Sequence, residues 1–122
     1  MRVFNKQVQT NVLLNASING PAIPLKYMFM YCIASIITGT PTGTLKLQAS
    51  NDPETNDTVP LSDNPPTHWV DVANSSFGVS ASGETMWNVT DVAYNYVRVV
   101  YTDGSAGAST ATMTTIFNGK GE

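Results

Sequence analysis

The feature that most constrains the fold of this chain is an alternation of apolar and polar residues with a period of two. It recurs between clusters of Gly, Pro, Asn, Asp and Ser, and the clearest example is TLKLQAS at residues 44–50. Such alternation is typical of half-buried strands. No segment places apolar residues at helical spacing over several turns, so the sequence predicts an all-β chain.

The alternation predicts about eight strands joined by short turns and by one long crossing loop, residues 51–67. This number suits an antiparallel two-sheet sandwich of jelly-roll type, and 122 residues suit a single domain. We expect one domain over residues 1–122, with residues 1–19 forming either an N-terminal arm or the first strands. The predicted strands are 2–9, 11–18, 26–37, 44–50, 69–72, 77–80, 85–89, 95–102 and 109–117, the second being either separate or a continuation of the first past a bend.

The longest apolar run, residues 27–37, predicts a central strand of the sandwich. Apolar side chains occupy both alternating sets of this run, so we expect both faces of the strand to be covered. At eleven residues, including Ser35, the run is too short to cross a membrane as a helix, which takes about 20 residues. We therefore expect no membrane partner.

Charge is sparse and slightly acidic. Charged residues make up 12% of the chain, about half the usual share of roughly 25%. The six basic residues are scattered and form no stripe along a phosphate backbone, so we expect no nucleic-acid partner. The lone Cys32 cannot form an intrachain disulfide, and the first twenty residues lack the apolar stretch of a secretion signal. Both observations favour synthesis in a reducing cytoplasm.

The residues do not indicate catalysis. A hydrolase or transferase needs a nucleophile, a base that activates it and a group that orients the base. The only imidazole is His68, which lies in a loop near a predicted strand start, and the only thiol is Cys32, inside the most apolar strand. Burial among apolar residues leaves a thiol inert. We expect no enzyme activity and no cofactor.

The crossing loop is acidic, because Asp52, Glu54 and Asp57 lie within six residues of one another. Carboxylates of this kind bind calcium in suitable loops, but their spacing matches no calcium-loop signature. We therefore expect an exposed, proline-rich acidic loop without a bound metal.

The aromatic side chains allow two interpretations. A platform on which a sugar stacks, as in sandwich-type carbohydrate modules, could be formed by Trp87, Tyr94 and Tyr96 together with Trp69 and Tyr101. Large rings are also the natural filling of a two-sheet core. We expect both Trp residues in the core and retain a glycan site at Trp87, Tyr94 and Tyr96 as the alternative.

Arg98 lies in the middle of a predicted strand, where an unpaired charge would be unfavourable. We expect its aliphatic stem to pack on Tyr96 or Trp87. We expect its guanidinium to pair with carbonyl groups or with a carboxylate, that of Asp71 or Asp91.

Three segments, residues 42–53, 68–102 and 115–122, resemble a pattern that recurs in small tailed-bacteriophage virion proteins. The pattern is a strand ending in Gln-x-Ser-Asn-Asp, two Trp residues further on, Tyr-x-Tyr-Val-Arg-Val-x-Tyr and a last strand ending in Gly-Lys-Gly, and it covers roughly the last two-thirds of the chain. Similar strand patterns occur in discoidin-like sandwiches that bind sugars or lipid head groups. The matching residues are Gln48, Ser50, Asn51, Asp52, Trp69, Trp87, Tyr94, Tyr96, Arg98, Tyr101 and Lys120.

The resemblance implies a jelly-roll-like module on a phage particle, and a chain of 122 residues is expected to lack the shaft of a tail fibre. It therefore favours a capsid decoration, or cement, protein, which binds across capsomer junctions on the capsid surface. The implied partners are the major capsid protein and further copies of the chain, as a homo-oligomer (dimer or trimer). Two alternatives remain. One is another virion module, namely a head fibre, a tail part or a receptor-binding module, and the other is a carbohydrate-binding sandwich.

The attachment surface is expected at the N-terminal segment together with the acidic loop. No Asp or Glu precedes Asp52, and in residues 1–19 apolar side chains alternate with amides rather than with charges. A strand of this composition either completes its own sheet or adds to the edge of a neighbour. The candidate interface residues are Arg2, Val3, Phe4, Lys6, Val8, Asp52, Glu54 and Asp57.

Overall fold

The computed structural model describes residues 2–53 and 65–121, except for the side chain of Arg2. Within these residues there are ten strands and no helix, and hence no helix long and apolar enough to cross a membrane. The strands are β1 (Arg2–Leu13), β2 (Ile18–Asn19), β3 (Ile23–Pro24), β4 (Met28–Thr38), β5 (Gly43–Ser50), β6 (Val70–Asp71), β7 (Phe77–Val79), β8 (Gly83–Thr90), β9 (Tyr96–Asp103) and β10 (Thr112–Gly121).

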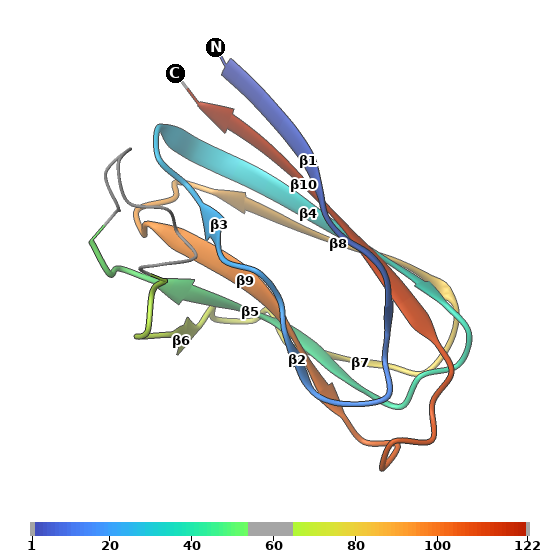
Figure 1. The fold of residues 1–122 in the computed structure, drawn as a ribbon. Coiled ribbons are helices and arrows are strands. Elements are labelled where there is room, and N and C mark those ends of the chain that lie inside the picture. The colour runs from blue at the N-terminus through green and yellow to red at the C-terminus, as the bar shows by residue number, and fades with distance from the viewer. Residues whose placement is uncertain (1, 54–64, 122) are drawn as a thin grey trace.

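The strands form two antiparallel sheets packed face to face (Figure 1). One sheet has the order β1-β10-β4-β8, and the other has the order β2-β9-β5-β6, in which β3 also pairs with β9 and β7 with β5. Because β2 and β3 share one position and β6 and β7 another, the ten strands fill eight positions. This order results when one long antiparallel ribbon is rolled into a sandwich. In the ribbon, β1 pairs with β10, β2 and β3 pair with β9, β4 pairs with β8, and β5 pairs with β6 and β7. It is the jelly-roll arrangement, so the predicted fold class is confirmed.

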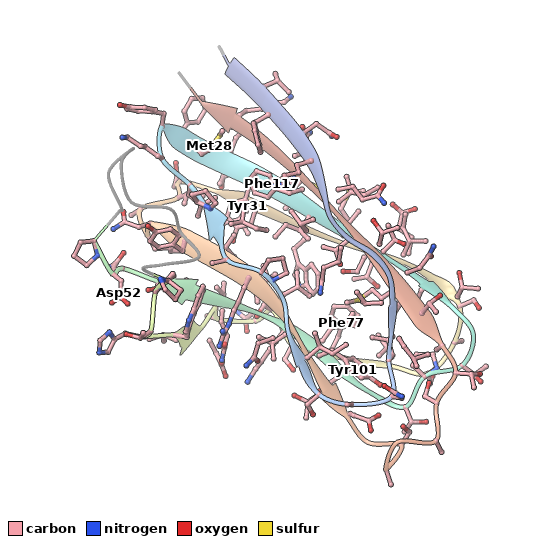
Figure 2. All side chains as sticks on the ribbon, viewed as in Figure 1. Met28, Tyr31, Asp52, Phe77, Tyr101 and Phe117 are labelled. Carbon is pink, nitrogen blue, oxygen red and sulfur yellow. The ribbon has the colours of Figure 1, made fainter. Side chains whose placement is uncertain are left out.

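The core lies between the two sheets, and the long strands direct alternate side chains into it. Figure 2 shows Tyr31, Phe117 and Tyr101 in this space. Seven inward apolar side chains of β5, β9 and β10 are at most 3% exposed, so the two sheets are closely packed on each other. These seven are Leu45, Leu47, Val97, Val99, Tyr101, Met113 and Phe117.

Strand β4 lies between β10 and β8, which confirms its predicted central position. Its inner side chains, among them Tyr31 and Ile37, are buried. Its outer side chains are not, since Met30 and Cys32 are half-buried and Ile36 is exposed. The expectation that both faces are covered was wrong, because within the described chain the second sheet covers only the inner face.

The N-terminal strands differ in extent from the prediction. β1 runs from residue 2 to residue 13 with register shifts on both sides of Gln9, and β2 and β3 are strands of two residues each. In the second shift, Asn11 has a φ of 47°, a left-handed conformation that Asn tolerates better than most residues. Residues 2–13 therefore belong to the four-stranded sheet. β3 was not predicted, because two residues are too few to show a period.

Candidate functional site

A groove opens between an edge strand of one sheet and an edge strand of the other. β1 forms one wall, and β3 with the turn that leads into β4 forms the opposite wall. The groove has a volume of about 510 Å³ and is partly open to solvent. It is lined by three of the predicted interface side chains, those of Phe4, Lys6 and Val8.

Strand register and alternation direct three β1 side chains into the groove. Phe4 is opposite Gly119 and Lys6 is opposite Phe117, and both β10 residues are buried. Because opposite residues of an antiparallel pair share a face, Phe4 and Lys6 point to the inner side of the sheet as well. Val8 follows on the same side by the alternation of the strand, and the register shift then places Gln9 opposite the buried Thr115.

The Phe4 ring lines the groove without being buried. It packs against the Phe117 ring with 6.2 Å between centroids, and 44% of its surface remains exposed. Gly119 makes this packing possible, because a Cβ at that position would lie 2.9 Å from both Met28 Sδ and the Phe117 ring. A larger residue there would displace these apolar side chains.

The turn between β3 and β4 supplies the opposite rim. It holds Tyr27 at a φ of 67°, and the Met28 N–H donates to the Leu25 carbonyl at 2.9 Å. Tyr27 is consequently turned outward and is 61% exposed. The Lys26 ammonium lies 5.3 Å from the centre of the Tyr27 ring, so the positive charge is held next to an aromatic face.

The groove combines an apolar floor with positive charge. Val8, Ile23 and Met28 are buried or half-buried, whereas Lys6 and Lys26 are exposed on opposite walls. In the part of the chain that the structure describes, no residue that lines the groove is acidic, and none forms a nucleophile and base pair. The arrangement is therefore suited to bind an elongated, partly apolar group that carries negative charge.

The structure brings together three of the eight predicted interface residues, Phe4, Lys6 and Val8. Val3 is 60% exposed, but it lies on the outer face of the sheet and does not line the groove. The side chain of Arg2, and all of Glu54 and Asp57, lie outside the described residues.

Asp52 does not line the groove beside β1 but lies at the base of the crossing loop (Figure 2). Its carboxylate accepts hydrogen bonds from the N–H of Thr67 at 2.6 Å and of His68 at 3.2 Å, and its Oδ1 lies 2.9 Å from His68 Nδ1. The bond from the Thr67 N–H is the main cause that lowers the pKa of Asp52 below its ordinary value. Asp52 therefore ties the two ends of the loop together, and His68 is the loop residue that the sequence predicted.

The predicted aromatic platform is not present among the described side chains. Trp87 is 9% exposed and donates its Nε1–H to the Ser75 carbonyl at 2.9 Å, and Tyr96 is 2% exposed. Tyr94 is half-buried, and its hydroxyl is hydrogen-bonded to the Tyr31 hydroxyl. The glycan interpretation of these rings was wrong, because two of the three are buried and cannot stack on a sugar.

Trp69 differs from Trp87, although both were expected in the core. Trp69 is half-buried, with the Arg98 guanidinium 4.1 Å from the centre of its ring. Arg98 also donates to Gln48 Oε1, from Nε at 3.0 Å and from Nη2 at 2.7 Å. The expected aromatic contact of Arg98 is present, but the ring is that of Trp69 rather than Tyr96 or Trp87. Of the two expected kinds of polar partner, the guanidinium binds a carbonyl oxygen, that of the Gln48 side chain, and not the carboxylate of Asp71 or Asp91.

Lys26 and Tyr27 complete the groove, yet they were not among the predicted site residues. The available signal was the proline-flanked segment PAIP at residues 21–24, which is followed, after the buried Leu25, by an exposed Lys and Tyr. Only the fold shows that this segment lies across from β1. In the described ranges, no group of three or more His, Cys, Asp or Glu side chains could hold a metal ion.

The chain matches no family model and no curated protein. Among solved structures, the SPBc2 prophage-derived protein YomS is similar over 97% of this chain and 92% of that chain, with a TM-score of 0.59 and 10% identity. A chain from Bacillus endospore appendages, a family of disulfide-linked pili, is similar over 98% of this chain and 88% of that chain, with a TM-score of 0.50 and 11% identity. At such low identity the similarity concerns the fold alone.

Proposed function

We propose that this chain is a structural, non-enzymatic component of a bacteriophage particle that decorates the capsid, binding across capsomer junctions and stabilising the shell. The observation that carries the proposal is the groove beside β1, an open surface with an apolar floor and two lysines. It gathers Phe4, Lys6 and Val8, which the sequence had already marked as interface residues. A decoration protein needs such a binding surface and needs no catalytic group.

Two further observations support a role in the virion. The last two-thirds of the chain carries the pattern of small tailed-phage virion proteins, and a prophage-derived protein shares the fold over 97% of this chain. Jelly rolls are also a frequent architecture of viral capsid domains. We propose the capsid surface as the location of the protein, after synthesis in the cytoplasm of the bacterial host.

The proposed partners are the major capsid protein and further copies of this chain, as a dimer or a trimer. Symmetric association strengthens weak contacts, because each attached subunit raises the local concentration of the others at the shell. Light scattering after size-exclusion chromatography measures the mass of the free protein. We expect two or three times the chain mass of 13.1 kDa, and the mass of one chain at every concentration would contradict the oligomer.

Copy number distinguishes decoration from the other virion roles. Quantitative mass spectrometry of purified particles gives the ratio of this chain to the major capsid protein. A simple fixed ratio is expected for a protein bound at every symmetry-equivalent junction. A few copies per particle would indicate a head fibre, a tail part or a receptor-binding module instead, and absence from particles would contradict every virion role.

A further inference from the structure

Strand β1 has an unpaired edge next to the groove. Within the described chain it pairs with β10 alone, and the pairing is continuous over the six residues from Arg2 to Gln7. Six residues of strand span about 20 Å. None of the six is Pro, so the backbone groups on the free side of this stretch are available to another strand.

The edge and the groove are arranged as strand addition requires. Side chains of a strand point alternately to the two faces of its sheet. An extended segment paired with the free edge of β1 would therefore direct every second side chain to the side of Phe4 and Lys6, which is the groove. The opposite wall offers no equivalent edge, because β3 has two residues and one of them, Pro24, has no N–H.

Charge decides what kind of segment fits. Lys6 and Lys26 are exposed on opposite walls, and none of the described residues that line the groove has a carboxylate that would neutralise them. A segment with acidic side chains would pair its carboxylates with these lysines, and its apolar side chains would lie on the floor formed by Val8, Ile23 and Met28. A basic segment would meet like charges on both walls.

The opposite edge of the same sheet lacks this combination. On β8, the inner side chain Trp87 is buried, and its ring lies 5.4 Å from that of Phe77. The second sheet therefore closes the space beside β8 that stays open beside β1. A strand added at β8 would find backbone partners there but no comparable apolar floor.

We propose that the groove binds an extended, acidic segment of a second protein, which joins the four-stranded sheet as a fifth strand beside β1. The proposal rests on the proposed function in that the second protein is taken to be the capsid shell protein. Backbone hydrogen bonds to β1 supply affinity that depends little on sequence. Phe4, Lys6 and Lys26 then select a segment with apolar and acidic side chains.

Photo-crosslinking in assembled particles, with the full chain, tests the proposal directly. Phe4→benzoylphenylalanine puts the reactive group in the groove, and Met86→benzoylphenylalanine, at an exposed position on β8, is the matched control. The expected product joins position 4 to an acidic segment of the shell protein, and the control does not give this product. No product from position 4, a product with a basic segment, or the same product from both variants would overturn the proposal.

Two measurements on binding itself do not depend on the crosslinker. Lys6→Glu combined with Lys26→Glu should weaken binding to shells stripped of the chain by about tenfold or more, whereas Lys120→Glu, on the outer face of β10, should change it less than about twofold. Hydrogen exchange should show new protection of alternate amides in residues 2–7 of the bound protein. If the folded Lys6→Glu, Lys26→Glu variant bound shells as tightly as the unchanged protein, or if no amide of β1 gained protection on binding, the proposed strand addition would be overturned.

The outcomes separate this proposal from the proposed function. If the chain is present in a fixed ratio to the shell protein and the Lys6→Glu, Lys26→Glu variant still binds shells normally, capsid decoration is supported and the groove is rejected as the binding site. A crosslink from position 4 to an acidic segment of a tail or head-fibre protein would support strand addition and would reject decoration.

Discussion

The two tryptophans should respond very differently to substitution, because one lies in the core and the other outside it. Trp87 is buried, packs against Phe77 and donates to the Ser75 carbonyl. Trp69 is half-buried and contacts Arg98 on the far side of its sheet from the core. We therefore expect Trp87→Ala to lower the free energy of unfolding much more than Trp69→Ala.

The expected loss for Trp87→Ala is about 3–5 kcal/mol, because the variant loses buried ring area and leaves a cavity. As an upper bound, burying ~150–250 Å² of aromatic surface at ~25 cal/mol per Å² is worth about 4–6 kcal/mol. Trp69→Ala should lose about 1–2 kcal/mol, the contribution of a partly desolvated cation–π contact. Trp87→Phe keeps a ring but leaves the Ser75 carbonyl without its donor, and should lose about 1–3 kcal/mol.

Equilibrium unfolding in urea measures these differences, and each Trp→Ala variant retains one Trp as a fluorescence probe. The dependence of the unfolding free energy on urea should be the same in all variants, so that their midpoints can be compared directly. Equal losses for Trp69→Ala and Trp87→Ala would refute the reasoning. A loss under about 1 kcal/mol for Trp87→Ala would do so as well, because it would lie in the range of ordinary substitutions.

Three other predictions concern the second sheet and the crossing loop. Arg98→Ala should lower the free energy of unfolding by about 1–2 kcal/mol in urea, because it removes the bonds to Gln48 and the contact with Trp69, and a loss under about 0.5 kcal/mol would mean that Arg98 behaves as an ordinary surface residue. Asp52→Asn should lower the melting temperature at neutral pH. The pKa of Asp52 in the folded protein lies below its ordinary value of 3.8. The difference in melting temperature between the variant and the unchanged protein should therefore be complete above pH 3.8 and disappear as the pH falls through the pKa of the folded state. A difference in melting temperature that does not depend on pH would contradict the role of the charge. EDTA should leave the melting temperature unchanged, since the acidic loop has no calcium-loop spacing, and a large fall would show a bound metal.

The fold class was predictable because the long strands have one face in the core. In β10, buried and more exposed residues alternate from Thr112 to Gly121. The apolar Met113 and Phe117 fall on the buried positions and the polar Asn118 on a more exposed one, although Thr115 and Ile116 break the apolar and polar alternation. The pattern was less informative for β4, where apolar residues occupy both faces. Such a run is equally compatible with a second covering layer and with an outer face that this chain leaves open, so only the structure decides.

The groove was harder to predict, because it depends on segments that are distant in the chain. Phe4, Lys6 and Val8 could be selected from the composition of β1, but the opposite wall is formed by β3, which is too short to show a period, and by the turn after it. The tryptophans illustrate the same limit. Both lie in short apolar stretches, and what separates them is the packing of Trp69 on Arg98, which comes from another strand.

The central claim is that this protein binds the capsid surface, and an icosahedrally averaged cryo-EM reconstruction of the mature particle tests it most directly. We expect density for a two-sheet sandwich at symmetry-equivalent positions over the capsomer junctions, with β1 and its groove turned toward the shell. A shell without such density, or density for this domain at the tail alone, would contradict capsid decoration.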